Sequence, residues 1–263
     1  MKTGEWMKHW VLAAVVCGSM PVLAEDPGSA PAKSACAQGP TLNVGAKSVG
    51  WNAGKTAFFY QGGLAIDADG APNAYHPEDK GLDYLANAGK PGNWWAIVTE
   101  DGKASGQPVV QGGDAPFPGY YVSTTALEDT AKPVKSPARY VDSSKVPYVV
   151  LPPQLLSSKT EGSARLGDFA AVVNTRSGKV AYALVADRGP KDKLGEGSIA
   201  LAEALGIASS PKKGGTASGV AYVVFPGSGN GKPRTLSEIN TEGERLLNAF
   251  GGAAKLTSCV GTK

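Results

Sequence analysis

The stretch that decides the fold reads VAYALVADRGPKDKLGEGSIALAEALGI over residues 180–207. Its first part is an apolar strand that carries Asp187 to its end, where a Gly-Pro pair turns the chain away. Glu196 follows between two glycines at the entry of a helix that Ser198 can cap. At such an entry the backbone N–H groups and the helix dipole can hold a negative group. The stretch therefore predicts a strand–loop–helix corner that presents two carboxylates.

Outside this corner, the chain of 263 residues contains 35 Gly and 19 Pro. So many turn-forming residues favour many short strands over long helices. Apolar runs predict strands over 57–66, 94–99, 120–124, 148–151, 169–174, 180–186 and 220–225. Helices are predicted over 82–88, 198–207 and 236–250. The pattern is typical of a mainly β (α+β) protein, with a small barrel, peripheral helices and long loops.

The first 24 residues have the pattern of a secretory signal. Lys2 and Lys8 precede a short apolar run, and small residues lead to Ala24. We therefore predict a signal peptide over 1–24, an N-terminal leader over 25–50 and one domain over 51–263. The protein is expected to be secreted or periplasmic, with no membrane contact after cleavage. An uncut membrane tether and a lipid anchor at Cys17 are the alternatives.

Cleavage after Ala24 would leave two cysteines, Cys36 and Cys259. Two cysteines in an exported chain indicate one disulfide, here between the two ends of the domain. Polymer theory assigns such a bridge about 5 kcal/mol. The alternative is a pair of free thiols.

Several kinds of chemistry are excluded by the counts. A net charge of +3 is too small to indicate nucleic-acid binding. The shortened chain would keep one histidine, His76, which reads as a loop residue, so a zinc site rich in His or Cys is not expected. There is no phosphate-binding or dinucleotide motif and no nucleophile elbow. Carboxylates remain, and Asp187 with Glu196 suits cleavage of a glycosidic bond. A separation of about 6.5–9.5 Å between the two groups would leave room for an attacking water.

The same residues resemble a known family. The segments Asp187-Arg-Gly-Pro190, Gly195-Glu-Gly-Ser198 and Ser198-Ile-Ala-Leu-Ala202 are similar, in order, to motifs of the family 75 glycoside hydrolases, the fungal-type chitosanases. The runs YVVLPP at 148–153, LGDFAAVV at 166–173 and IDADG at 66–70 also resemble that family.

The resemblance implies an inverting endo-hydrolase of the β-1,4 bonds of chitosan, with residues 51–263 as the catalytic domain. Asp187 and Glu196 match the catalytic Asp and Glu of the family. The loop between them is shorter than in the fungal pattern, and Arg188 places a cation beside Asp187. We expect that cation to lower the pKa of Asp187, which suits a base that activates water, with Glu196 as the acid.

The corner also resembles the double-psi β-barrel of rare lipoprotein A and the expansins. This second resemblance implies a six-stranded double-psi barrel and leaves the function open in two directions. One is a peptidoglycan-cleaving muramidase or lytic transglycosylase. The other is a non-catalytic, expansin-like protein that binds cell walls.

Four further residues are predicted to bind the polysaccharide: Asp67, Asp69, Arg188 and Trp94. Two carboxylates in a cleft suit a polycationic sugar, and one ring of the Trp94-Trp95 pair can stack on it. The turn at Asp67 starts like a calcium loop but lacks the later ligands, so no metal is expected, and no cofactor is expected either. The sequence leaves the oligomeric state open.

Overall fold

The structure is a computed structural model, and it describes residues 1, 36, 41–157 and 160–261. The chain divides into two units, Met1–Ala32 and Lys33–Lys263, and the helices and strands described below belong to the second. Apart from Met1, the predicted signal peptide over 1–24 lies outside the described residues, as do residues 25–35 of the predicted leader.

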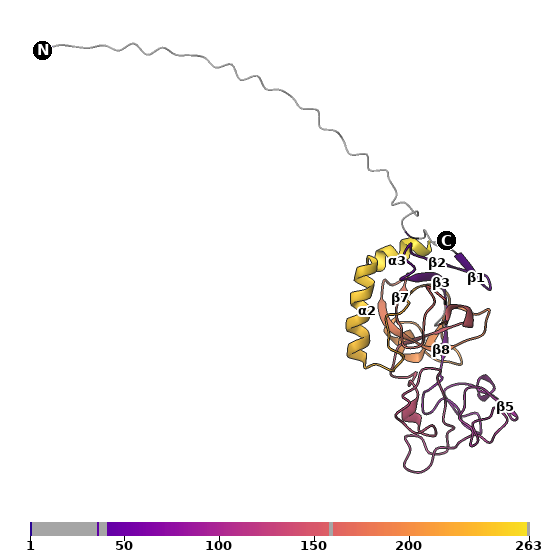
Figure 1. Cartoon of the computed structure of the whole chain (residues 1–263). Coiled ribbons are helices and arrows are strands. Elements are labelled where there is room, and N and C mark those ends of the chain that lie inside the picture. The colour runs from indigo at the N-terminus through magenta and orange to yellow at the C-terminus, as the bar shows by residue number, and fades with distance from the viewer. Residues whose placement is uncertain (2–35, 37–40, 158–159, 262–263) are drawn as a thin grey trace. The chain divides into compact units, whose positions relative to one another are not determined.

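Six strands close into a mixed β-barrel (Figure 1). In order around the barrel they are β3 (Phe58–Asp67), β10 (Thr216–Phe225), β7 (Phe169–Asn174), β8 (Val180–Arg188), β6 (Tyr148–Leu151) and β9 (Glu196–Ser198). The barrel closes because β3 pairs with β10 on one side and with β9 on the other. The β6–β8 and β3–β9 pairs are parallel, whereas the other neighbouring pairs are antiparallel. The expected mainly β fold with a six-stranded barrel is confirmed.

Both faces of the barrel strands are covered by apolar groups. Along β7, Ala170 and Val172 belong to one apolar cluster, and Ala171 and Val173 belong to another. Because neighbouring residues of a strand point to opposite faces, neither face of β7 is left to solvent. This explains why the strands read as continuous apolar runs rather than as alternating patterns.

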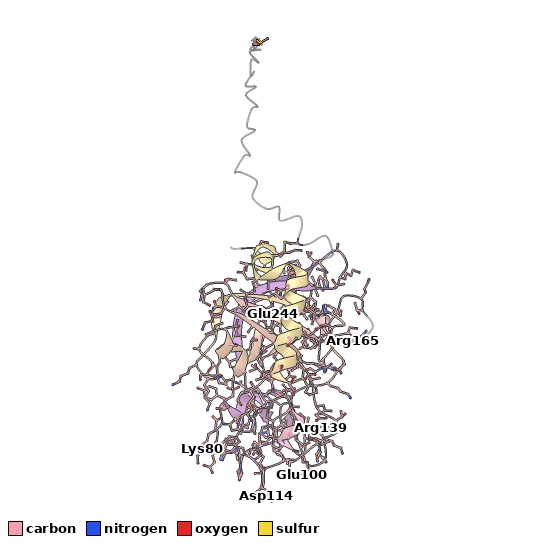
Figure 2. The ribbon with its side chains drawn as sticks, turned by 90° about the vertical axis from the view of Figure 1, so that its left-hand side faces the viewer. Lys80, Glu100, Asp114, Arg139, Arg165 and Glu244 are labelled. Carbon is pink, nitrogen blue, oxygen red and sulfur yellow. A yellow bond between two sulfur atoms is a disulfide. The ribbon has the colours of Figure 1, made fainter. Side chains whose placement is uncertain are left out.

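The helices follow their capping signals. α1 (Ile199–Ala204) starts at Ser198, whose hydroxyl accepts a hydrogen bond from the backbone N–H of Leu201. α2 (Leu236–Phe250) has the predicted bounds and starts at a capping box formed by Thr235 and Glu238. It lies along the outside of β7 and β8, with Glu244 on its exposed side (Figures 1 and 2). Gly251, at a φ of 115°, ends α2, and an unpredicted helix α3 (Gly252–Val260) follows.

The predicted helix over 82–88 is wrong. This segment contains only a short 3-10 helix, η2 (Leu85–Asn87). The Asp83 side chain accepts hydrogen bonds from the backbone N–H of Tyr84 and from the side chain of Asn87. A short polar side chain that bonds locally in this way competes with helical hydrogen bonds.

Small elements surround the barrel. β1 (Thr41–Val44) and β2 (Lys47–Trp51) form an unpredicted hairpin that extends the sheet at β3. Two more short strands and two 3-10 helices lie in the connections: β4 (Gly89–Lys90), β5 (Asn93–Trp94), η3 (Pro137–Arg139) and η4 (Pro153–Leu155). The strands predicted over 94–99 and 120–124 are reduced to β5 and isolated bridges such as Ile97–Ser123.

The long connection between β3 and β6 is held by side chains rather than by regular structure. Arg139, labelled in Figure 2, donates two hydrogen bonds of 2.8 Å to the carboxylate of Glu128 and one of 2.6 Å to the carbonyl of Lys132. Such a two-pronged contact fixes a loop more firmly than a single ion pair.

A disulfide joins Cys36 to Cys259, as predicted, across 223 residues of sequence. A disulfide of this kind indicates an extracellular protein. Among the described residues, no helix combines the length and the apolar character that crossing a bilayer requires.

Candidate active site

Four neighbouring strands bring the predicted catalytic residues onto one surface. Ala65 of β3 pairs with Glu196 of β9, Glu196 pairs with Val150 of β6, and Val150 pairs with Asp187 of β8. Residues that are paired across strands share a face of the sheet, and Asp67 lies on the same face because it is two residues beyond Ala65. The register therefore gathers three carboxylates in one row.

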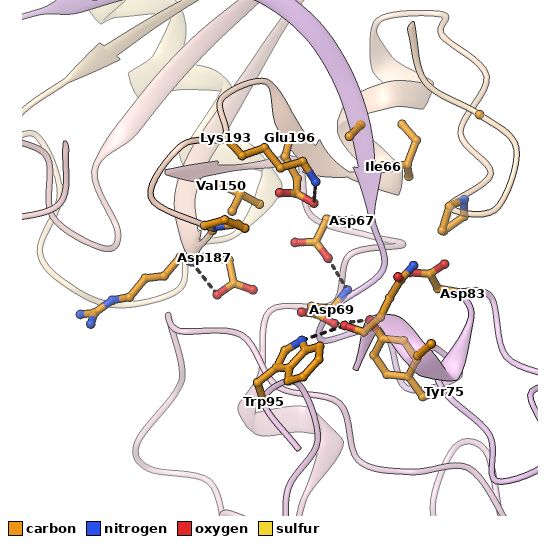
Figure 3. A pocket seen from close by; sticks show the side chains of 18 residues that line it. Ile66, Asp67, Asp69, Tyr75, Asp83, Trp95, Val150, Asp187, Lys193 and Glu196 are labelled. Carbon is orange, nitrogen blue, oxygen red and sulfur yellow. Dashed lines mark hydrogen bonds and ion pairs between the residues drawn. The ribbon is translucent and has the colours of Figure 1, made fainter. Parts of the chain in front are cut away.

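This row forms the floor of a cleft of about 590 Å³ (Figure 3). Asp187, Glu196, Asp67, Asp69 and Arg188 all line it, so the structure brings together five of the six predicted site residues. The lining also includes residues outside the predicted site, among them Tyr75, Asp83 and Lys193, and the second ring of the tryptophan pair, Trp95.

Asp187 is buried and well connected. Its Oδ1 accepts hydrogen bonds from the backbone N–H groups of Ala126 (3.0 Å) and Arg188 (2.7 Å). Burial, with a smaller contribution from the charge of Glu196, raises the pKa of Asp187 to about 7. The expected lowering by the Arg188 cation is therefore wrong as a net direction. Arg188 is exposed, and its effect is too weak to offset the burial of the carboxyl group.

Asp67, the last residue of β3, and Asp69, in the turn that follows, are half-buried. The Asp67 carboxylate accepts a hydrogen bond of 2.9 Å from the backbone N–H of Asp69, and the Asp69 carboxylate accepts one of 2.6 Å from the hydroxyl of Tyr75. Burial and the neighbouring carboxylates raise the pKa values of both groups well above their ordinary range. These aspartates and Asp187 each offer an oxygen within 4.8 Å of the others. Three carboxyl groups this close share protons at neutral pH unless a cation enters between them.

Glu196 has a different environment. It begins the strand β9 rather than the helix, so its predicted place at a helix entry is wrong. Its carboxylate forms an ion pair of 2.9 Å with Lys193, and its side chain is 19% exposed. Lys193 belongs to the loop between the two predicted catalytic residues, so the same loop that separates Asp187 from Glu196 also gives Glu196 a cation. The two carboxyl groups therefore differ in partner and in burial, as acid–base pairs in active sites do.

The prediction chose the wrong tryptophan of the pair: Trp95, not Trp94, lines the cleft. Trp94, predicted to bind substrate, is 6% exposed, packs against Tyr121 and does not line the cleft. Trp95 is 61% exposed and lines the cleft, with its ring held by a hydrogen bond from its N–H to the carbonyl of Asn87. Alternation along the strand predicts opposite faces for the two rings, but only the tertiary packing shows which one is outside.

His76 lies away from the cleft lining. Its Nδ1 accepts a hydrogen bond from the backbone N–H of Glu78, and its ring packs edge-on against Tyr120. This agrees with its interpretation as a loop residue.

The chain matches a known protein family. The model of the fungal chitosanases of glycosyl hydrolase group 75 matches residues 101–249, which include Asp187 and Glu196 and make up more than half of the chain. A search of the curated proteins finds no match to the chain. The chain therefore belongs to the fungal chitosanase family of glycosyl hydrolase group 75, a family of glycoside hydrolases.

Proposed function

We propose that this protein hydrolyses the β-1,4 bonds of chitosan with inversion, using Asp187 and Glu196 as the catalytic pair. Membership of the chitosanase family implies the substrate and the type of enzyme. The observation that carries the proposal for the site is the register in which Asp187 and Glu196 flank Val150 on the cleft floor.

Inversion is the part of the proposal that the family resemblance implies. Inverting glycosidases hold their carboxyl groups about 6.5–9.5 Å apart, whereas retaining enzymes hold them about 5–5.5 Å apart. Asp187 and Glu196 lie on the two strands that flank β6, so the attacking water and the sugar ring would bind above Val150, between the two groups.

The environments of the two groups support one division of roles. Asp187, with a pKa of about 7, keeps a proton at mildly acidic pH and can give it to the oxygen of the leaving sugar. Glu196, paired with Lys193, is the carboxylate that takes a proton from the attacking water. This division reverses the one expected from the Arg188 cation.

The other carboxylates support a cationic sugar as substrate. Asp67 and Asp69 lie beside Asp187, and their mutual repulsion is relieved when an ammonium group of glucosamine binds between them. Peptidoglycan carries no comparable array of positive charges, so this cleft suits chitosan better than a bacterial wall. Trp95 supplies an exposed ring on which a sugar can stack.

We further infer that the chain is exported by the signal at 1–24 and that its barrel has double-psi topology. The Cys36–Cys259 disulfide supports export. Two parallel pairs, β6–β8 and β3–β9, within an otherwise antiparallel barrel support the topology. N-terminal sequencing of the secreted protein and an experimental structure would test these two points.

The central experiment is release of reducing ends by the purified protein from chitosan, acetylated chitin oligomers and peptidoglycan, measured side by side. Wild type should act on chitosan, and Glu196→Gln and Asp187→Asn should each lose about 10²–10⁴ in kcat because general acid–base catalysis contributes that much. Proton NMR of the first product should show the α-anomer. Activity on peptidoglycan alone, or full activity of either variant, would refute the proposal.

A further inference from the structure

One end of the cleft is closed by two chain segments that meet. The first segment is 81–84, which precedes η2, and the second is 208–215, which follows α1. Within the first, Asp83 lines the cleft while its neighbour Leu82 lines a second cavity of about 510 Å³. Within the second, Gly214 lines the cleft, Ser210 lines the second cavity, and Pro211 lines both. The two segments therefore form a wall with a cavity on either side.

Lys212 holds this wall together. Its Nζ donates a hydrogen bond of 2.9 Å to the carbonyl of Gly81 and lies 4.9 Å from the centre of the Tyr84 ring. Each segment is also held by backbone hydrogen bonds that do not involve Lys212. Leu82 donates a backbone hydrogen bond to Asn73, and the 208–215 loop is closed on itself by a hydrogen bond from Gly215 to Ala208. Lys212 thus bridges two braced loops through one flexible side chain, so removing its charge and its donor is expected to loosen the wall without dismantling either loop.

The space beyond the wall offers the same kinds of group as the cleft. Asp142, which forms an ion pair with Lys145 of the same lining, and Glu203 contribute carboxyl groups, and Phe117 contributes an aromatic ring that is 37% exposed. Carboxylates and an exposed ring are the groups that bind an aminosugar unit. A polymer that could pass the wall would therefore find further contacts there.

We propose that Lys212 is a specificity-determining residue: its bridge to Gly81 and Tyr84 ends the cleft and limits the number of sugar units bound on that side. The proposal rests on the proposed hydrolysis of chitosan. A longer chain must bend out of the cleft at Pro211, and its additional units contribute nothing to binding. The bridge also places a cation at the end of an acidic cleft, which opposes the approach of a further glucosamine.

The test compares Lys212→Met with Lys213→Met in the full-length protein. Methionine keeps the length of the side chain and removes the charge and the donor, and Lys213 is the adjacent, exposed lysine, which makes it a matched control. kcat/KM is measured on glucosamine oligomers of increasing length until it stops rising. In Lys212→Met the rise should continue for at least one sugar unit more than in wild type, and that unit should add about fivefold, the value of one aromatic contact. Lys213→Met should match wild type, and Tyr84→Leu should show a smaller effect of the same sign.

We call the oligomer length at which kcat/KM stops rising the limiting length. The proposal would be overturned if Lys212→Met and wild type had the same limiting length, or if Lys212→Met lost the same factor in kcat/KM at every length. Calorimetric binding of the same oligomers separates this result from a failure of the proposed function. Wild type that binds but does not hydrolyse would refute the assigned activity, while the limiting length for binding would still decide the role of Lys212.

Discussion

Replacing Asp187 by asparagine is expected to lower kcat by about 10²–10⁴ and to stabilise the protein at about pH 8. The carboxyl group is buried, and its pKa is raised from an ordinary value of 3.8 to about 7. Between these two values the folded protein holds a proton that the unfolded chain has released, so the free energy of unfolding falls as the pH rises through this range. Above about pH 7 the folded protein carries the full cost of a buried charge.

The size of the gain follows from the same numbers. A rise of about three pH units corresponds to about 4 kcal/mol, since each unit is worth about 1.4 kcal/mol. Asparagine retains an Oδ1 that can accept the hydrogen bonds from Ala126 and Arg188. Because Asp67 and Asp69 share the proton equilibrium, we expect about 2–4 kcal/mol at pH 8 and little difference near pH 4. For a domain of this size that is a rise in melting temperature of roughly 5–15 °C.

The assay is thermal and urea unfolding of wild type and Asp187→Asn between about pH 4 and pH 8. Asp168→Asn is the matched control. Asp168 is also buried, but its two carboxylate oxygens accept three backbone hydrogen bonds, from Arg165, Gly227 and Gly229. An amide cannot accept on both sides, so this variant should lose stability at pH 8. If Asp187→Asn were no more stable than wild type at pH 8, or if its advantage did not shrink on acidification, the argument from the buried charge would be refuted.

Three further outcomes are expected. Trp95→Ala should raise the KM for chitosan about 2–10-fold with little change in kcat, because it removes a stacking surface and no reacting group; a fall in kcat alone would contradict this. Tyr75→Phe removes the hydrogen bond that lowers the pKa of Asp69, so the KM for chitosan should rise about tenfold. As the pH falls, Asp69 should take up its proton at a higher pH in the variant than in wild type, and a pH series of KM would show binding weaken at that higher pH. Replacing Cys36 and Cys259 by serine should cost up to about 5 kcal/mol in urea unfolding and leave KM unchanged; unaltered stability would show that the bridge is dispensable.

Much of the fold follows from local pattern. The strands β6 and β7 and the helix α2 have the bounds that their apolar runs and capping residues predict, because these signals are local and strong. The segments 94–99 and 120–124 were harder to predict, since their apolar residues serve as core contacts of a long connection rather than as strands of a sheet. The β1–β2 hairpin carries few apolar residues, and its pairing with β3 depends on a partner distant from it in the packed core.

The features of the site also divide into those set by local sequence and those set by tertiary contacts. The sequence by itself determined that Asp187 lies at the end of an apolar strand and that Cys36 and Cys259 tie the ends of the domain. It placed Glu196 at the entry of a helix, whereas Glu196 begins the strand β9 and α1 starts three residues later. Only the tertiary structure decided which residue lies opposite Val150. A β-bulge between β6 and β8 skips Ala186 and puts Asp187 there, whereas an unbroken register would turn the carboxyl group to the other face.

Burial decided the rest. It set the direction of the pKa of Asp187 against the nearby Arg188, and it put Trp95 rather than Trp94 at the cleft. Pairing register and burial both arise from contacts between segments far apart in the chain, and a local sequence pattern does not predict such contacts.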